Sequence, residues 1–323
     1  MALSKLVELI GQSFQLVFED LRSGQRQAAL GLRRAARLPF LAALHAELQR
    51  PLVFLTDRTD RALAMYEELG LWASQATRLF FPEPTPLFYE NAAWGEHTRR
   101  ERLTALTTLA AYHIPGATAS PTAPILLAPA RGLMTRTMPR RDFLKATRTL
   151  RRGQNHPPDE IARQLVSLGY EPVNTVIGPG QFARRGGILD IWPAADSFPA
   201  RLDFFGDEID TLRRFDPATQ ITFKHSHALQ AEVAAPERLL ITPAREYLAP
   251  SQGSSGENRD APLEYSEFHL PLLHTTPASL LDYLPRNTLV LIDNTLALED
   301  LVQEVEEQAV SLRRDSINDD ILP

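Results

Sequence analysis

The sequence predicts an α/β protein whose parallel sheet, covered by helices on both faces, is interrupted by a smaller α+β module. Between residues 37 and 128, short apolar runs alternate with segments of helical periodicity, and this alternation builds parallel sheets. From residue 147 onward the pattern changes to short strands, punctuated by glycines, around one helix. The change of pattern indicates the inserted module.

The composition agrees with a folded chain. The length suggests about two domains, and a hydrophobic content of 44% is enough for packed cores. Cysteine is absent, which excludes disulfides, thiolate zinc sites and cysteine nucleophiles and suits the reducing cytoplasm. The net charge of −6 argues against a surface that binds nucleic acid throughout. No apolar run approaches the ~18 residues that cross a bilayer, so we expect a soluble, cytoplasmic protein with no membrane contact.

The elements of the sheet domain are expected in a regular order. The first 21 residues read as an amphipathic helix rather than a signal peptide. There follow helix 37–48, strand 51–56, helix 60–69, strand 77–81, helix 99–112, the loop 113–124 with its overlapping strand 124–128, and, near the C-terminus, helical turn 279–284, strand 287–293 and helix 296–314.

The module is expected to hold strand 148–151, helix 158–168, strand 171–176 and three further short strands, with a strand at 239–241 leading out of it. Pro158 suits the first turn of the helix, and Gly169 suits its C-terminal cap. Residues 250–262 form a polar loop. We therefore expect a first domain of residues 1–146 completed by 234–323, and the module at 147–233.

The most informative segment lies at 178–215, inside this module. In the strand Arg201-Leu202-Asp203-Phe204-Phe205, a period of two places Leu202 and Phe204 on the core face and the other three side chains on the opposite face. An outward aromatic beside an arginine is typical of a protein-binding hot spot. The alternative is that Phe205 fills a second core under a loop.

A phosphate-binding loop is sought between Gly31 and Leu38. Such a loop needs a second glycine, a lysine and a hydroxyl that ligates magnesium. Here Ala36, Arg37 and Leu38 stand in those places, so we expect a degenerate loop that hydrolyses no nucleotide. Asp293 ends a strand as a Walker B aspartate does, but Asn294 follows it, and a carboxamide is no general base. The alternative role for Asp293 is to cap the next turn.

No metal or cofactor site is expected. His225 and His227 share a strand face, yet no third ligand lies at a suitable spacing. The aromatic residues Phe88, Tyr89 and Trp94 could stack on nucleic-acid bases, but packing within the protein is favoured.

Two long motifs carry a family resemblance: GQFARRGGILDIWP at 180–193 and RLDFFGDEIDTLRRFD at 201–216. They resemble the second domain of the transcription-repair coupling factors (Mfd), a module that imitates part of the excision-repair protein UvrB. The resemblance extends over residues 15–310. It implies a UvrB-like domain with a degenerate RecA-type, P-loop-type fold and an inserted module that binds UvrA.

By this resemblance the contact residues for UvrA are Arg185, Arg201 and Phe205. Strict alternation places Arg185 with Leu189 and Ile191 on the core face, unless the Gly186-Gly187 pair bulges the strand and re-aims it. Arg184 is the alternative assignment.

The resemblance further implies an adaptor with no catalytic activity, which recruits UvrA for transcription-coupled nucleotide excision repair. Full-length members bind RNA polymerase and move along double-stranded DNA through later domains. This chain ends before those domains, so we expect either a fragment or a truncated relative. The alternative function is a UvrB-like, ATP-dependent DNA-binding motor fragment.

Overall fold

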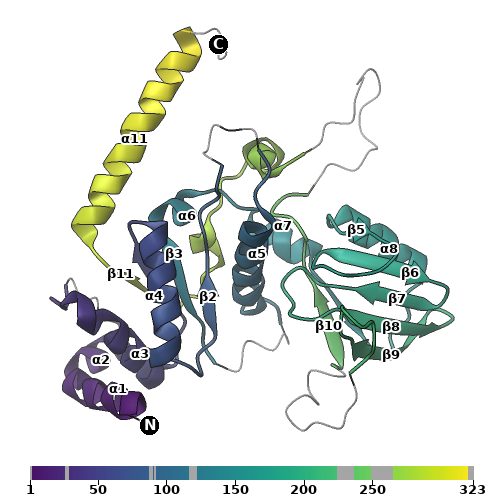
Figure 1. The fold of residues 1–323 in the computed structure, drawn as a ribbon, viewed down its shortest axis with the longest axis horizontal. Coiled ribbons are helices and arrows are strands. Elements are labelled where there is room, and N and C mark those ends of the chain that lie inside the picture. Colours follow the sequence, from purple (N-terminus) through teal and green to yellow (C-terminus); the bar gives the residue numbers. More distant parts are fainter. Residues whose placement is uncertain are drawn as a thin grey trace. The chain divides into compact units, whose positions relative to one another are not determined.

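The computed structural model describes residues 2–25, 29–86, 90, 92–115, 122–223, 236–248 and 265–318 (Figure 1). The chain forms two compact units. The first comprises residues 1–83, 119–134 and 285–323, and the second comprises residues 84–118 and 135–284. Among the described residues, no helix is long and apolar enough to span a membrane.

A four-stranded parallel sheet forms the first unit. Its strands are β11 (Leu289–Ile292), β1 (Leu52–Thr56), β3 (Ile125–Pro129) and β2 (Arg78–Phe80), in that spatial order. Both central strands, β1 and β3, are buried along their whole length. Burial on both faces explains why they appear in the sequence as continuous apolar runs, and the predicted parallel sheet is confirmed.

Six α-helices accompany this sheet within the described residues: α1 (Ala2–Ser13), α2 (Gln15–Arg22), α3 (Arg37–Leu48), α4 (Thr59–Trp72), α6 (Ala130–Met134) and α11 (Thr295–Asn318). The predicted N-terminal helix is two helices that meet at Phe14, whose ring packs edge-on against Phe40, 4.9 Å away between ring centroids. Eight consecutive residues of α3 are buried, from Leu38 to His45. Together with α4, this helix covers the sheet face that carries Phe54 and Leu127.

The second unit is built on a five-stranded mixed sheet: β5 (Glu171–Pro172), β6 (Gln181–Arg185), β7 (Ile188–Ile191), β8 (Ala200–Phe205) and β9 (Glu208–Arg214). The pair β5–β6 is parallel and the other pairs are antiparallel. The same unit also contains helices α5 (Glu96–Ala111), α7 (Arg140–Ala146), α8 (Pro158–Ser167) and α10 (Leu270–Leu273) and the antiparallel pair β4 (Arg148–Arg151) and β10 (Arg238–Ile241).

Two expectations for the module strands are wrong. The strand predicted at 171–176 ends at Pro172, because the chain then turns so that Val176 is buried in a small cluster with Trp192 and Phe215. Four strands follow instead of three, because Gly186-Gly187 and Gly206-Asp207 each close a two-residue hairpin turn. Gly206 adopts a φ of 62°, which glycine reaches without steric cost.

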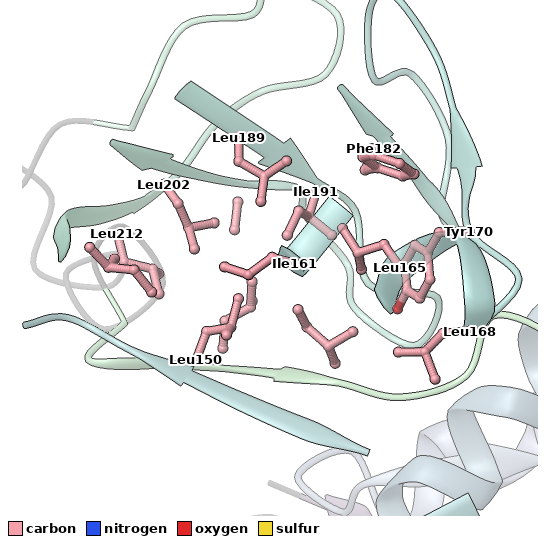
Figure 2. Close-up of a cluster of buried hydrophobic side chains, with 14 of the residues drawn as sticks. Leu150, Ile161, Leu165, Leu168, Tyr170, Phe182, Leu189, Ile191, Leu202 and Leu212 are labelled. Atoms are coloured by element: carbon pink, nitrogen blue, oxygen red, sulfur yellow. The ribbon is translucent and has the colours of Figure 1, made fainter. Parts of the chain in front are cut away.

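One hydrophobic core unites the module. Ile161 and Leu165 of α8 pack among Leu189, Leu202 and the residues of the β4–β10 pair. Figure 2 shows these side chains filling the space between the five-stranded sheet and that pair. The helix begins and ends as predicted: Pro158 lies in its first turn, and Gly169 follows its C-terminus with a φ of 84°.

Candidate protein-interaction surface

Two neighbouring hairpin tips bring the predicted contact residues together. The β6–β7 hairpin turns at Gly186-Gly187, and the β8–β9 hairpin turns at Gly206-Asp207. The backbone N–H of Phe204 donates to the carbonyl oxygen of Gly187 at 2.8 Å. A Cβ atom on Gly187 would lie 3.2 Å from the Phe204 oxygen. The tips are therefore adjacent, and the contact leaves little room for a side chain at residue 187.

The alternation predicted for β8 is confirmed. Leu202 is fully buried in the module core, and Phe204 packs against the same core. Arg201 and Asp203 lie on the opposite face, where they pair with other side chains of the sheet. Phe205, at the end of the strand, is 83% exposed. The alternative that Phe205 fills a second core is therefore wrong, although Phe215 occupies such a core on the outer face.

Arg185 lies on the outer face without a bulge in its strand. The turn at Gly186-Gly187 pairs Arg185 with Ile188, and the register continues evenly to the pair Phe182–Ile191. The prediction that Arg185 shares the core face with Leu189 and Ile191 was wrong. A two-residue loop pairs residue i with residue i+3, so Arg185 shares a face with Ile188 and not with Leu189. The alternative, Arg184, lies opposite Leu189 and forms an ion pair with Asp159 of α8. It therefore belongs to the helix-covered face.

A single buried carboxylate organises both arginines. Asp190, in the middle of β7, has no exposed side-chain surface. Its Oδ1 accepts from Nε of Arg201 at 2.7 Å, and its Oδ2 accepts from Nη2 of Arg201 at 2.9 Å. Nη2 of Arg185 donates to the same Oδ2 at 3.0 Å. Charge-assisted bonds of this bidentate kind are both strong and directional.

The two arginines differ in how firmly they are held. Beyond Asp190, Arg201 donates from Nη1 to the carbonyl oxygen of Gln220 at 3.2 Å, and its guanidinium carbon lies 4.7 Å from the centre of the Phe215 ring. The bonds to Asp190 raise the pKa of Arg201, against the lowering effect of its partial burial. Its side chain is 18% exposed, whereas that of Arg185 is 55% exposed.

Sequence reasoning missed three members of this surface. Asp190 is the central acceptor, Ile188 is exposed beside Arg185, and Arg213 forms an ion pair with Asp203. The signal that would have found them is the cross-strand register, because Asp190 lies directly opposite Arg201. Directly opposed residues of opposite charge interact across a sheet.

Comparisons with known proteins identify the family. The sequence pattern of the UvrB interaction domain matches residues 149–247. The transcription-repair-coupling factor of Bacillus subtilis is 24% identical over 323 residues, which cover 91% of this chain and 26% of that protein. That of Myxococcus xanthus is 32% identical over 246 residues, or 74% of this chain and 19% of that protein. The chain corresponds to the N-terminal region of these coupling factors.

This N-terminal region spans about a quarter or less of the length of such coupling factors, with 26% of the Bacillus subtilis protein and 17% of the Escherichia coli protein covered. The range matched by the UvrB interaction domain contains the whole mixed sheet and β10. It therefore includes Arg185, Asp190, Arg201 and Phe205. The interaction surface therefore lies entirely within the matched range.

The other site of the coupling-factor region lies in the first unit, at the sequence that resembles a phosphate loop. Gly31 has a φ of 63°, residues Arg34–Ala36 form a 3₁₀ turn, and Arg37 begins α3. Nη1 of Arg37 donates to Oδ1 of Asp293 at 2.5 Å. Leu38 is buried. Arg37, which the sequence places at the lysine position of a degenerate loop, thus makes an ion pair with Asp293.

A second arginine forms an ion pair with the same carboxylate. Arg61 of α4 forms an ion pair with Oδ2 of Asp293, and its other terminal nitrogen lies 3.6 Å from Oδ1 of Asp57. The side chain of Asp293 has no exposed surface. The expected cap at this point is made by Asn294 instead, whose Oδ1 accepts from the N–H of Ala297 at 3.3 Å. Both oxygens of Asp293 therefore face guanidinium groups of the protein itself.

Two remaining expectations concern aromatic residues and metals. Phe88, Tyr89, His225 and His227 lie outside the described residues. Trp94 is buried, with the guanidinium carbon of Arg102 4.6 Å from the centre of its ring, so the packing role is confirmed for this residue. In the part of the chain that the structure describes, no group of three or more His, Asp or Glu side chains is placed to hold a metal ion.

Proposed function

We propose that this chain is an adaptor that recruits UvrA in transcription-coupled nucleotide excision repair, and that Arg185, Arg201 and Phe205 form its recruiting surface. The observation that carries the proposal is Phe205, 83% exposed at a hairpin tip beside the tip that carries Arg185. Large exposed aromatics with a neighbouring arginine are the residues that dominate protein interfaces. The match of this segment to the UvrB interaction domain supports the same role.

The chemistry of the surface favours an acidic partner. Arg185 offers a half-exposed guanidinium at its edge, and a guanidinium forms bidentate bonds with carboxylates. Phe205 would supply the apolar anchor within a pocket of the partner. UvrA is therefore expected to present one or more carboxylates around an apolar recess.

We propose that the module comprises residues 147–233, inserted into a UvrB-like domain of residues 1–146 and 234–323 with a degenerate RecA-type fold. Strand β10, just beyond residue 233, contributes Leu239 and Ile241 to the module core. In the complete coupling factor, RNA polymerase and double-stranded DNA would be bound by other parts of the protein, in the bacterial cytoplasm.

This region is proposed to hydrolyse no ATP and to need no cofactor. Arg37 and Arg61 already neutralise Asp293, and a magnesium-bound nucleotide would have to displace them. Ala36 and Leu38 lack the glycine backbone and the hydroxyl that a phosphate loop uses. The groups that an ATP-dependent motor fragment would require are therefore replaced in this chain, which argues against that alternative.

Calorimetric titration of the chain with a UvrA homologue tests the adaptor proposal. Wild type should bind, and Phe205→Ala should cost about 2 kcal/mol, a loss of roughly 30-fold in affinity. The double variant Arg201→Ala/Phe205→Ala should abolish measurable binding. Val166→Ala is the matched control, because Val166 is an exposed apolar residue on α8, on the helix-covered face of the sheet. Equal affinities for wild type and Phe205→Ala would contradict the assignment of the surface.

A further inference from the structure

We propose that Asp190 is a positioning residue of the interaction surface, which orients the guanidinium of Arg185 toward the partner. In the same arrangement Arg201 acts chiefly by holding Asp190 in place. This inference rests on the proposed function, because it concerns the same surface. It assigns different tasks to two arginines that the family resemblance treats alike.

The position of Asp190 supports this role. It lies in the middle strand of three, opposite Ala183 of β6 and Arg201 of β8. Its carboxylate is completely buried yet accepts three hydrogen bonds, two from Arg201 and one from Arg185. A buried charge is stable only when it is paired and hydrogen-bonded. Two arginines around one carboxylate are therefore a coupled unit, in which a change at Asp190 reaches both.

Arg201 is poorly suited to be the main contact itself. Nε, Nη1 and Nη2 all donate to groups within the module, and one side of the guanidinium faces the Phe215 ring. Its side chain is only 18% exposed, so little of the guanidinium is open to a partner, and a partner carboxylate could bind to Nε and Nη2 only by displacing Asp190. That step would strand a buried carboxylate, which is costly.

Arg185 has the complementary properties. Its single hydrogen bond to a side chain among the described residues, from Nη2 to Asp190, anchors one edge of the guanidinium. A guanidinium has five N–H donors, so most of the group stays available at a half-exposed position. Anchoring before binding lowers the entropy lost when the partner docks. The arrangement therefore preorganises Arg185 for an acidic partner.

A double-mutant cycle between Asp190 and Arg185 tests the inference, with UvrA affinity as the readout. Asp190→Asn keeps an acceptor oxygen but removes the charge. We expect it to weaken binding about tenfold in the wild-type background and by less than about twofold in the Arg185→Ala background, since coupled residues are non-additive. Equal fold-losses in the two backgrounds would overturn the inference, because a general structural effect multiplies in both.

Asp203→Asn is the matched control. Asp203 is also a carboxylate on the outer face, but it accepts from Thr211 and Arg213 instead of Arg185. Its effect on affinity, whatever its size, should multiply with that of Arg185→Ala. The conservative variant Asp190→Glu should restore more of the affinity than Asp190→Asn does, because it keeps the carboxylate.

Two further measurements keep the inference open to refutation. If Asp190→Asn fails to fold, the variant Asp190→Asn/Arg201→Gln replaces both buried charges with amides and should bind as weakly as Arg185→Ala; wild-type affinity would overturn the inference. The side-chain ¹⁵N–¹H spectrum of Arg185 needs no partner, and its Nη signals should be resolved in the wild type and lost in the Asp190 variants. If wild type does not bind UvrA, the proposed function fails, and this spectrum alone decides whether Asp190 positions Arg185.

Discussion

Replacing Asp293 with asparagine tests whether the ion pairs of Asp293 with Arg37 and Arg61 stabilise the folded first unit. The variant keeps the shape of the side chain and removes the charge that Arg37 and Arg61 neutralise. Two guanidinium groups are then left beside each other at one site. The variant should therefore destabilise the folded first unit, whereas the same substitution at a solvent-exposed aspartate should have little effect on stability.

The size of the effect follows from the burial of the three side chains. Asp293 is 0% exposed, while Arg37 is 22% and Arg61 is 18% exposed. Breaking a fully buried pair costs 3–5 kcal/mol, as an order-of-magnitude estimate. Because both arginines reach solvent, we take the lower end, about 3 kcal/mol.

Amide hydrogen exchange resolved by residue measures this loss where it occurs. In the regime of fast reclosing, exchange reports the local free energy of opening, so about 3 kcal/mol corresponds to a rate increase of roughly 100-fold in β1 and β11. Strand β8, in the other unit, serves as the internal reference. The matched control is Asp60→Asn, because Asp60 pairs with Arg58 in an exposed ion pair at 3.2 Å, worth at most about 1 kcal/mol. Exchange in β1 that stays within about twofold of wild type for Asp293→Asn refutes the reasoning.

Three further predictions concern stability. Burial lowers the pKa of His45 below its usual 6.5, against the raising effect of its bond to Ala123. The contribution of His45 to stability is therefore complete above pH 6.5 and is lost as the pH falls toward the lowered pKa. In urea unfolding, His45→Gln should lack this part of the pH dependence. Glu246→Gln should lower the free energy of unfolding by about 3–5 kcal/mol, because it leaves the fully buried Arg102 without the carboxylate that lies 2.6 Å from its Nε. The double variant Arg102→Met/Glu246→Leu should recover most of that loss. A loss below about 1 kcal/mol for Glu246→Gln would contradict the pairing. Leu202→Ala should cost about 2–5 kcal/mol in urea unfolding, and a near-zero cost would contradict its place in the core.

The periodicity of the sequence determined most of the architecture. Fully apolar runs identified β1 and β3, because a central parallel strand is buried on both faces and needs no polar residue. Strict alternation separated Leu202 from Phe205, since side chains on a strand point to opposite faces in turn. These signals are local, so each can be detected within one segment of the chain.

Only the tertiary structure decided which side chains meet. The face occupied by Arg185 depends on how the two-residue turn sets the register between β6 and β7. The role of Asp190 appears only when β6, β7 and β8 lie side by side. The ion pair between Arg37 and Asp293 joins residues 256 positions apart in the sequence. Periodicity describes one strand or helix at a time, whereas the strength of a charge pair is set by the distance and burial that packing imposes.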